Sequence, residues 1–261
     1  MGLHSSIAHM EKEVYKDSVM HKLDGRIKII MALGMIIYAV TVPDVTSLLL
    51  LESYLFILLF LSRLSLLYVM TRILLILPFG GVIALFQPFI RSGIVLYSLP
   101  FGLAITYEGI LFGLLLLFKL IVCVTAIILL SSTTPMQELV GSARRLGLPK
   151  GFALLLGLMT RYLFVFYDVF QRIRMAQKTR CFSVRGKSYK WVLEQIGYTI
   201  GTLFIRAYEQ GERVYLSMLS RGYNPDSQMY VSEKRIGAQD IAVMTMTLLV
   251  IGCLASAKYW L

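Results

Sequence analysis

The chain has 261 residues, of which 57% are hydrophobic and 16% are charged, and its mean hydropathy is +0.71. Soluble globular domains contain about 45–50% apolar and about 25% charged residues, so these values exclude an ordinary soluble fold, a disordered chain and a coiled coil. The chain has 26 Lys and Arg residues against 15 acidic residues, a net charge of +11. A basic chain of this hydropathy is expected to be a polytopic membrane protein whose cations gather on one side of the bilayer.

Five apolar stretches approach the roughly 20 residues that a helix needs to cross a bilayer. The first begins only after Arg26, so no cleavable signal peptide is expected. Pro78 and Gly80 predict that the third stretch is kinked or partly re-entrant, and 93–106 is too short and too rich in Gly and Pro to span. The predicted spans are about 27–42, 45–61, 67–90, 107–131 and 239–259.

Most of the positive charge lies in residues 132–238, which hold 16 of the 26 Lys and Arg residues and 7 of the 15 acidic residues. The positive-inside rule places this stretch in the cytoplasm, together with the N-terminal arm, and five spans then leave the C-terminus outside. We therefore divide the chain into 1–131 (arm and first spans), 132–238 (cytoplasmic helices) and 239–261 (last span). The predicted fold class is all-α, with membrane helices and long cytoplasmic amphipathic helices.

Two long amphipathic helices are expected within the cytoplasmic stretch, over about 151–181 and about 191–221, and each becomes more charged towards its end. A shorter helix precedes them. It carries Arg144 and Arg145 and stops at Gly147. Such helices are expected to meet anionic headgroups and acidic protein surfaces rather than nucleic acid.

The last parts of the two long helices resemble each other at an offset of 41 residues. Each contains an acid, an arginine, a small residue and a second arginine at intervals of four, so the four lie along one helical face. The acid-first pairs are expected to stabilise each helix by ~0.2–0.5 kcal/mol. The two series are Asp168, Arg172, Ala176 and Arg180, and Glu209, Arg213, Ser217 and Arg221.

The second arginine of each series has no acid one turn before it and is flanked by small residues. The two runs are Thr179-Arg180-Cys181 and Ser220-Arg221-Gly222. The helix dipole favours a cation at a helix C-terminus, which explains one such arginine. Two equal endings also suit a guanidinium offered to a carboxylate of a partner, which its planar fork binds through two hydrogen bonds. The residues alone leave capping and partner docking equally open.

With these two motifs, the chain resembles the T (transmembrane coupling) components of energy-coupling-factor transporters, whose cytoplasmic coupling helices end in two small-Arg-small motifs. The runs 144–149 and 18–28 are also similar to the family, most of all to its cobalt branch, CbiQ, or the nickel counterpart. The resemblance covers most of the chain. Cys181 departs from it, where Gly or Ser is commoner, as does Gly25, where Pro is usual.

The resemblance implies a non-catalytic subunit of an ATP-driven cobalt importer in the inner membrane of a prokaryote. Arg180 and Arg221 would bind acidic residues on two cytoplasmic ABC-type ATPase subunits, and the helices would tilt a membrane-embedded, substrate-capturing S component. Alternatives are the same role for nickel or a vitamin, a membrane scaffold that binds anionic lipid, and a transporter that works alone. No cofactor is expected on this chain. The remaining residues of the implied site are Thr179, Cys181, Ser220 and Gly222 at the motifs, and Asp168, Arg172, Glu209, Arg213, Arg144 and Arg145 in support.

Two charged residues interrupt predicted spans, Glu52 and Lys119. A lone charge in hydrocarbon is costly, so the sequence favours a mutual ion pair over a proton or ion path. The pairing predicts that replacing both residues by Ala is milder than either single replacement.

Other chemistry is not supported. Residues 186–188, Gly-Lys-Ser, end like a phosphate-binding loop, but Cys181 stands where that loop needs its first glycine. The histidines His4, His9 and His21 have neither ligand spacing nor a supporting acid cluster, so no metal site is expected.

Overall fold

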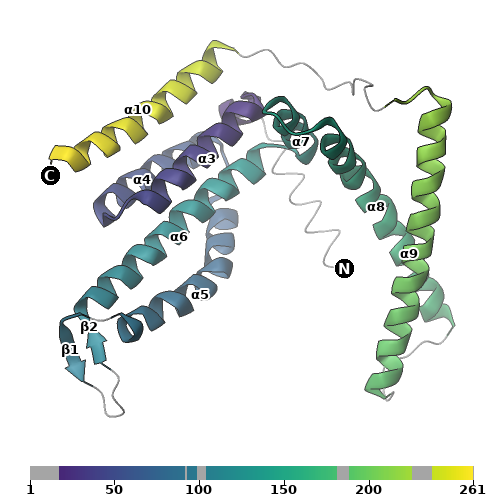
Figure 1. Cartoon of the computed structure of the whole chain (residues 1–261), viewed down its shortest axis with the longest axis horizontal. Coiled ribbons are helices and arrows are strands. Elements are labelled where there is room, and N and C mark those ends of the chain that lie inside the picture. Colours follow the sequence, from purple (N-terminus) through teal and green to yellow (C-terminus); the bar gives the residue numbers. More distant parts are fainter. Residues whose placement is uncertain (1–17, 92, 99–103, 181–187, 225–236, 261) are drawn as a thin grey trace. The chain divides into compact units, whose positions relative to one another are not determined.

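The computed structural model describes residues 18–91, 93–98, 104–180, 188–224 and 237–260. Almost all of them are helical, so the predicted all-α fold class is confirmed (Figure 1). The exception is an antiparallel hairpin in which Val95 lies opposite Thr106. The elements are α2 (Val19–Lys22), α3 (Gly25–Thr41), α4 (Val45–Leu61), α5 (Leu66–Ile90), β1 (Val95–Ser98), β2 (Ala104–Thr106), α6 (Tyr107–Thr133), α7 (Met136–Arg145), α8 (Lys150–Thr179), α9 (Tyr189–Ser220) and α10 (Ala238–Trp260).

The chain divides into two compact units. The first unit comprises residues 1–146 and 233–261, and the second unit comprises residues 147–232 with α8 and α9. The short helix α7 belongs to the first unit, whereas its charge grouped it with the long helices in the sequence. It packs against α3, where a Cβ atom added to Gly25 would lie 2.5 Å from Ser142 Oγ. The bare Cα of Gly25 therefore gives α7 room to approach.

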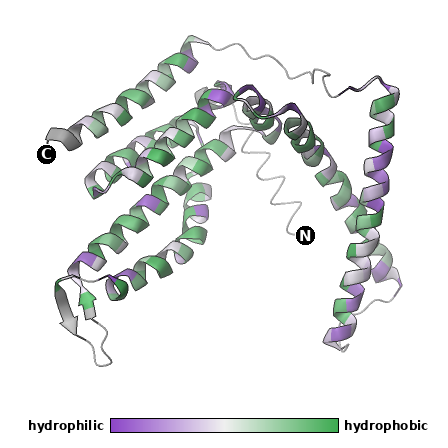
Figure 2. Cartoon of the chain, viewed as in Figure 1, coloured by the Kyte–Doolittle hydropathy of each residue, from purple (hydrophilic) through white to green (hydrophobic). Residues whose placement is uncertain are grey.

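The core of the first unit lies between α3, α4 and α6 and consists of aliphatic side chains. Its fully buried members include Leu23, Met35, Leu48, Leu51, Leu55, Leu59 and Val122. Figure 2 shows that these helices and α5 are largely apolar along their length. Many of their large apolar side chains are exposed, among them Phe60 at 76% and Leu67 at 81%. Apolar exposure along whole helices is typical of helices surrounded by lipid.

Four helices have the length and composition to cross a membrane, namely α5, α6, α8 and residues 238–256 of α10. Three of them coincide with predicted spans. The other two predicted spans form α3 and α4, which have 17 residues each. Helix α8 was not predicted to span; its first part is apolar and its last part is charged, as expected from the sequence (Figure 2). The chain is a multi-pass membrane protein.

The α5–α6 contact depends on glycines in α6. A Cβ atom at Gly113 would lie 2.6 Å from the carbonyl oxygen of Ala84, and one at Gly109 would lie 2.6 Å from the Cα of Pro88. The two backbones therefore touch, as small residues permit in membrane helices. Helix α5 contains Pro78 and bends part-way along its length, which agrees with the predicted kink (Figure 1).

The starts of α3 and α10 and the end of α6 lie together in the first unit. Lys28 Nζ donates to the carbonyl oxygen of Thr133 at 2.9 Å, and the main-chain N–H of Asp24 donates to Asp240 Oδ1 at 2.9 Å. If α3 to α6 cross the bilayer in turn, the start of α3 and the end of α6 must lie on the same side. These contacts agree with that arrangement.

Candidate functional site

The two long helices of the second unit end at the predicted arginines. Helix α8 has 30 residues and α9 has 32, and Arg180 and Arg221 occupy their C-cap positions. At a rise of 1.5 Å per residue the helices are about 45 Å and about 48 Å long. The predicted helix ends at 181 and 221 are confirmed to within two residues.

The two ends have the same local geometry. Thr179 Oγ1 donates to the carbonyl oxygen of Ala176 at 2.9 Å, and Ser220 Oγ donates to that of Ser217 at 3.0 Å. Each arginine N–H donates to the carbonyl three residues before it. The backbone angles φ and ψ are −86° and 24° at Arg180 and −92° and 11° at Arg221. In both motifs the hydroxyl group, of Thr179 or Ser220, thus donates its hydrogen bond within its own helix.

Gly222 explains how α9 stops. Its φ is +78°, a left-handed conformation that glycine adopts without strain. The next N–H, that of Tyr223, then reaches back to the carbonyl of Met218 at 3.0 Å, which closes the helix in a Schellman motif. Cys181, the corresponding residue of the first motif, lies outside the described residues.

Both arginine side chains are exposed. Within the described part of the chain, neither guanidinium has a hydrogen bond, an ion pair or an aromatic partner. A cation that only capped its helix would be expected to lie over the last carbonyls. The two guanidiniums are therefore available to a carboxylate of another subunit.

The predicted i,i+4 ion pairs are not formed. Among the described residues, Asp168 and Arg172 make no ion pair, and Arg213 Nη2 donates to Gln210 Oε1 at 3.2 Å instead of to Glu209. All four predicted partners are exposed. An exposed pair gains only a few tenths of a kcal/mol, too little to fix two mobile side chains.

Arg144 and Arg145 lie elsewhere than the long helices. They occupy the last turn of α7 in the first unit and are half-buried. A cation is favoured there by the helix dipole.

Helices α8 and α9 are joined close to the first arginine. Gln177 Nε2 donates to Thr199 Oγ1 at 2.7 Å, three residues before Arg180. Thr199 lies 22 residues before Arg221, which is about 33 Å along α9. Arg180 is therefore near the contact between the helices, and Arg221 is at the far end of α9.

One face of α9 is apolar and exposed. It repeats at intervals of three or four and comprises Leu193, Ile196, Ile200 and Phe204, each at least half exposed. On a neighbouring face the Tyr198 hydroxyl donates to Glu194 Oε1 at 3.1 Å. This hydrogen bond and the carboxylate charge raise the pKa of Tyr198 above its ordinary value.

The predicted pair of Glu52 and Lys119 is wrong. Glu52 Oε1 accepts a hydrogen bond from Thr125 Oγ1 at 3.0 Å, whereas Lys119 Nζ donates to the carbonyl oxygen of Val40. Thr125 and Lys119 are six residues apart on α6, so they point about 120° apart around the helix. Only the face with Thr125 meets α4 at Glu52.

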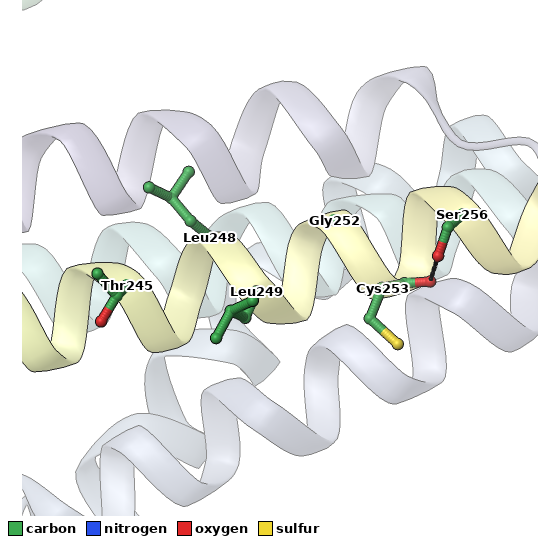
Figure 3. A pocket seen from close by; sticks show the side chains of 6 residues that line it. All are labelled: Thr245, Leu248, Leu249, Gly252, Cys253 and Ser256. Atoms are coloured by element: carbon green, nitrogen blue, oxygen red, sulfur yellow. Dashed lines mark hydrogen bonds between the residues drawn. The ribbon is translucent and has the colours of Figure 1, made fainter.

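The described residues include a shallow depression on α10, which is lined by Thr245, Leu248, Leu249, Gly252, Cys253 and Ser256 (Figure 3). Ser256 Oγ donates to the carbonyl oxygen of Cys253 at 2.9 Å, so it serves its own helix. Among the residues that the structure describes, no group of three or more His, Cys, Asp or Glu side chains could hold a metal ion. His4 and His9 lie outside them.

The sequence did not reveal the buried polar contacts at the start of α3. Asp24, Lys28 and Asp240 are 3%, 4% and 6% exposed. The sequence analysis covers Lys28 only within the run 18–28 that resembles the family, and Asp240 only as part of the last predicted span. Their position at the ends of predicted spans is the signal that could have singled them out.

The profile of the family described as "cobalt transport protein" (CbiQ) matches residues 16–231, which include both arginine motifs and α3 to α9. The chain belongs to this family. The predicted resemblance is thereby confirmed. As a CbiQ-family protein, the chain is a transmembrane component of an energy-coupling-factor type transporter.

Individual relatives agree with this membership. The chain is 25% identical over 259 residues to an energy-coupling factor transporter transmembrane protein, EcfT, of Thermosediminibacter oceani, covering 94% of this chain and 96% of the relative. It is 27% identical over 246 residues to an uncharacterised protein of Methanocaldococcus jannaschii, covering 92% and 83%. It is also 29% identical over 150 residues to a putative fused cobalt transport protein, CbiMQ, of Methanocorpusculum labreanum, covering 58% of this chain and 24% of the relative.

Proposed function

We propose that the chain is the coupling subunit of an ATP-driven importer for cobalt ions. Arg180 and Arg221 each bind an acidic residue on one of two cytoplasmic ABC-type ATPase subunits. The long helices pass the movement of the ATPases to a membrane-embedded S component that captures the substrate. In this proposal the chain itself does not hydrolyse ATP and lies in the inner membrane of a prokaryote. The family description and the name of the fused CbiMQ relative support cobalt as the substrate.

The observation that carries this proposal is the equality of the two helix ends. Thr179 and Ser220 bond in the same way, and the arginine that follows each is exposed with its guanidinium unused within the described residues. Two helix ends with the same geometry, here called the tips and formed by Arg180 and Arg221, suit two copies of one docking groove. Their separation along α9 suits two separate subunits rather than one.

Charge reversal of the tips tests the proposal. Arg180→Glu and Arg221→Glu place a carboxylate opposite the acid of the ATPase, and breaking such a buried pair costs about 3–5 kcal/mol, roughly a hundredfold or more in affinity. Each single variant should lower the amount of ATPase that co-purifies in detergent, and the double variant should abolish co-purification and ⁵⁷Co²⁺ uptake.

Arg174→Glu and Arg206→Glu are matched controls, because these arginines are also exposed on the same two helices but belong neither to the two motifs nor to their supporting residues. They should retain the ATPases. If the tip variants also retain the ATPases and transport normally, the docking role is wrong. If the wild-type chain co-purifies with ATPases but transports Ni²⁺ or a vitamin instead of Co²⁺, only the substrate is wrong.

A further inference from the structure

Asp240 closes the N-termini of two helices at once. Its carboxylate is almost fully buried, with the residue 6% exposed. Oδ2 accepts the main-chain N–H of Gly237 at 2.8 Å, and Oδ1 accepts that of Asp24 at 2.9 Å. Gly237 precedes α10, and Asp24 is the N-cap of α3. The two helices therefore begin at one shared carboxylate.

This arrangement is a capping box divided between two helices. In an ordinary capping box, the acid at the third helical position accepts the N–H of its own N-cap residue. Asp240 does so for α10. Helix α3 has Ile27 at its third position, which cannot accept, and Asp240 supplies the bond from 216 residues away. The positive dipole ends of both helices meet at this negative charge.

Lys28 makes the matching contact with the end of α6. It is 4% exposed, and Nζ donates to the carbonyl oxygens of Thr133 at 2.9 Å and His21 at 3.4 Å. Thr133 is the last residue of α6, where carbonyl groups lack partners within the helix and a cation is favoured. Through α7, which packs on Gly25, this end of α6 leads into the second unit.

The first turn of α3 thus binds both chain connections of the second unit. The chain reaches residue 147 through α6 and α7, which contact Lys28 and Gly25. It returns from residue 232 into α10, which Asp240 fixes to Asp24. Movement of the second unit can act on the membrane helices through the covalent chain only by way of these connections.

We propose that the first turn of α3, from Asp24 to Lys28, is a joint that holds both connections of the second unit, with Asp240 and Lys28 as its positioning residues. The inference rests on the proposed coupling function, because a joint of this kind matters when α8 and α9 are moved by ATPases. Without this joint, the two connections would change position when α8 and α9 move, and the movement would not reach the membrane helices.

A distance measurement tests the joint directly. Spin labels are attached to Lys22→Cys and Gln239→Cys, both exposed positions next to the joint, with Cys123, Cys181 and Cys253 replaced by Ser in the full-length chain in lipid nanodiscs. Asp240→Ala removes both accepted bonds and should broaden the distance distribution at least twofold. Asp240→Asn retains one acceptor oxygen and should broaden it less. Asp44→Asn is the matched control, because Asp44 is an exposed helix N-cap without a side-chain cap bond.

A second label pair tests the other contact if Asp240→Ala does not fold. Labels on Lys22→Cys and Ser131→Cys, both exposed, report the position of the α6 end. Lys28→Ala should broaden this distribution, and Lys28→Gln, which keeps a side-chain N–H donor, should broaden it less. Unchanged widths in Asp240→Ala or Lys28→Ala would overturn the joint.

Coupling is then measured on the complex with its ATPases. Asp240→Ala should retain ATPase co-purification and ATP hydrolysis within twofold but lower ⁵⁷Co²⁺ uptake at least tenfold, an uncoupling that simple loss of stability would not give. Unchanged uptake, or loss of the ATPases from the complex, would contradict the proposal. If the wild-type chain binds no ATPase, the proposed function fails on its own, and the label widths still decide whether the joint exists.

Discussion

Thr125 of α6 lies between two acceptors, with its hydroxyl oxygen 3.0 Å from Glu52 Oε1 of α4 and 2.8 Å from the carbonyl oxygen of Ile121. A hydroxyl has one proton to donate. Thr125 therefore shares its one hydroxyl proton between Glu52 Oε1 and the carbonyl oxygen of Ile121. This contact gives the Glu52 carboxylate a hydrogen-bond partner on α6, among otherwise apolar helices.

Replacing Glu52 tests this hydrogen bond. Glu52→Gln keeps an acceptor oxygen and a similar size, and it should change the free energy of unfolding by less than about 1 kcal/mol. Glu52→Ala removes the bond and leaves a cavity, at a cost of about 2–4 kcal/mol. Thermal unfolding in detergent provides the comparison. Equal destabilisation by both variants would show that the hydrogen bond contributes nothing.

The separate partners of Glu52 and Lys119 change the expected effect of combining substitutions. Because the two side chains share no contact, Glu52→Ala and Lys119→Ala should destabilise additively, within about 0.5 kcal/mol. The ion pair expected from the sequence would have made the double variant milder. A double-mutant cycle on the melting temperature separates these outcomes.

Gly113 should tolerate no side chain. Its Cβ atom would lie 2.6 Å from the carbonyl oxygen of Ala84, and a backbone atom cannot rotate away. Gly113→Ala should therefore separate α5 from α6 and cost about 1–3 kcal/mol. Gly81→Ala is the matched control, since nothing lies within 4 Å of its Cβ position. Equal melting temperatures for the two variants would disprove close backbone contact.

Gly222 should be needed for the end of α9. Alanine in its left-handed conformation costs about 1–2 kcal/mol, so Gly222→Ala should open the turn that holds the N–H of Tyr223. Hydrogen exchange at Tyr223 should accelerate roughly tenfold. Gly211→Ala, within α9 and without neighbours at its Cβ position, should leave this exchange rate unchanged. Protection that survives Gly222→Ala would argue against the Schellman turn.

The sequence predicted the helical elements well because each signal was local. Apolar runs, Pro-Gly breaks and the small-Arg-small motifs placed α4, α5, α8 and α9 within a few residues of their observed ends. The hairpin of β1 and β2 was expected only as a stretch unable to span. Helix α7 was assigned by its charge, but its packing depends on the missing side chain of Gly25, which periodicity does not report.

For the candidate site, the sequence indicated which residues to consider but not which residues they contact. Arg180 and Arg221 were found because they repeat at a fixed offset. The partners of Glu52 and Asp240 could not be found in this way, because they depend on which helix faces cross at depth. The surface ion pairs failed for another reason, since their net free energy is too small to select one rotamer.

The contact between Gln177 and Thr199 has a mechanical consequence. If α9 swings about this point, Arg180 is close to the fulcrum and Arg221 is at the end of a lever arm of about 33 Å. A swing of 10° then displaces Arg221 by about 6 Å, from the same helical rise. Arg180 belongs to α8 and does not take part in this swing. A change in the angle between the two helices would therefore displace Arg221 far more than Arg180, which lies beside the contact on α8.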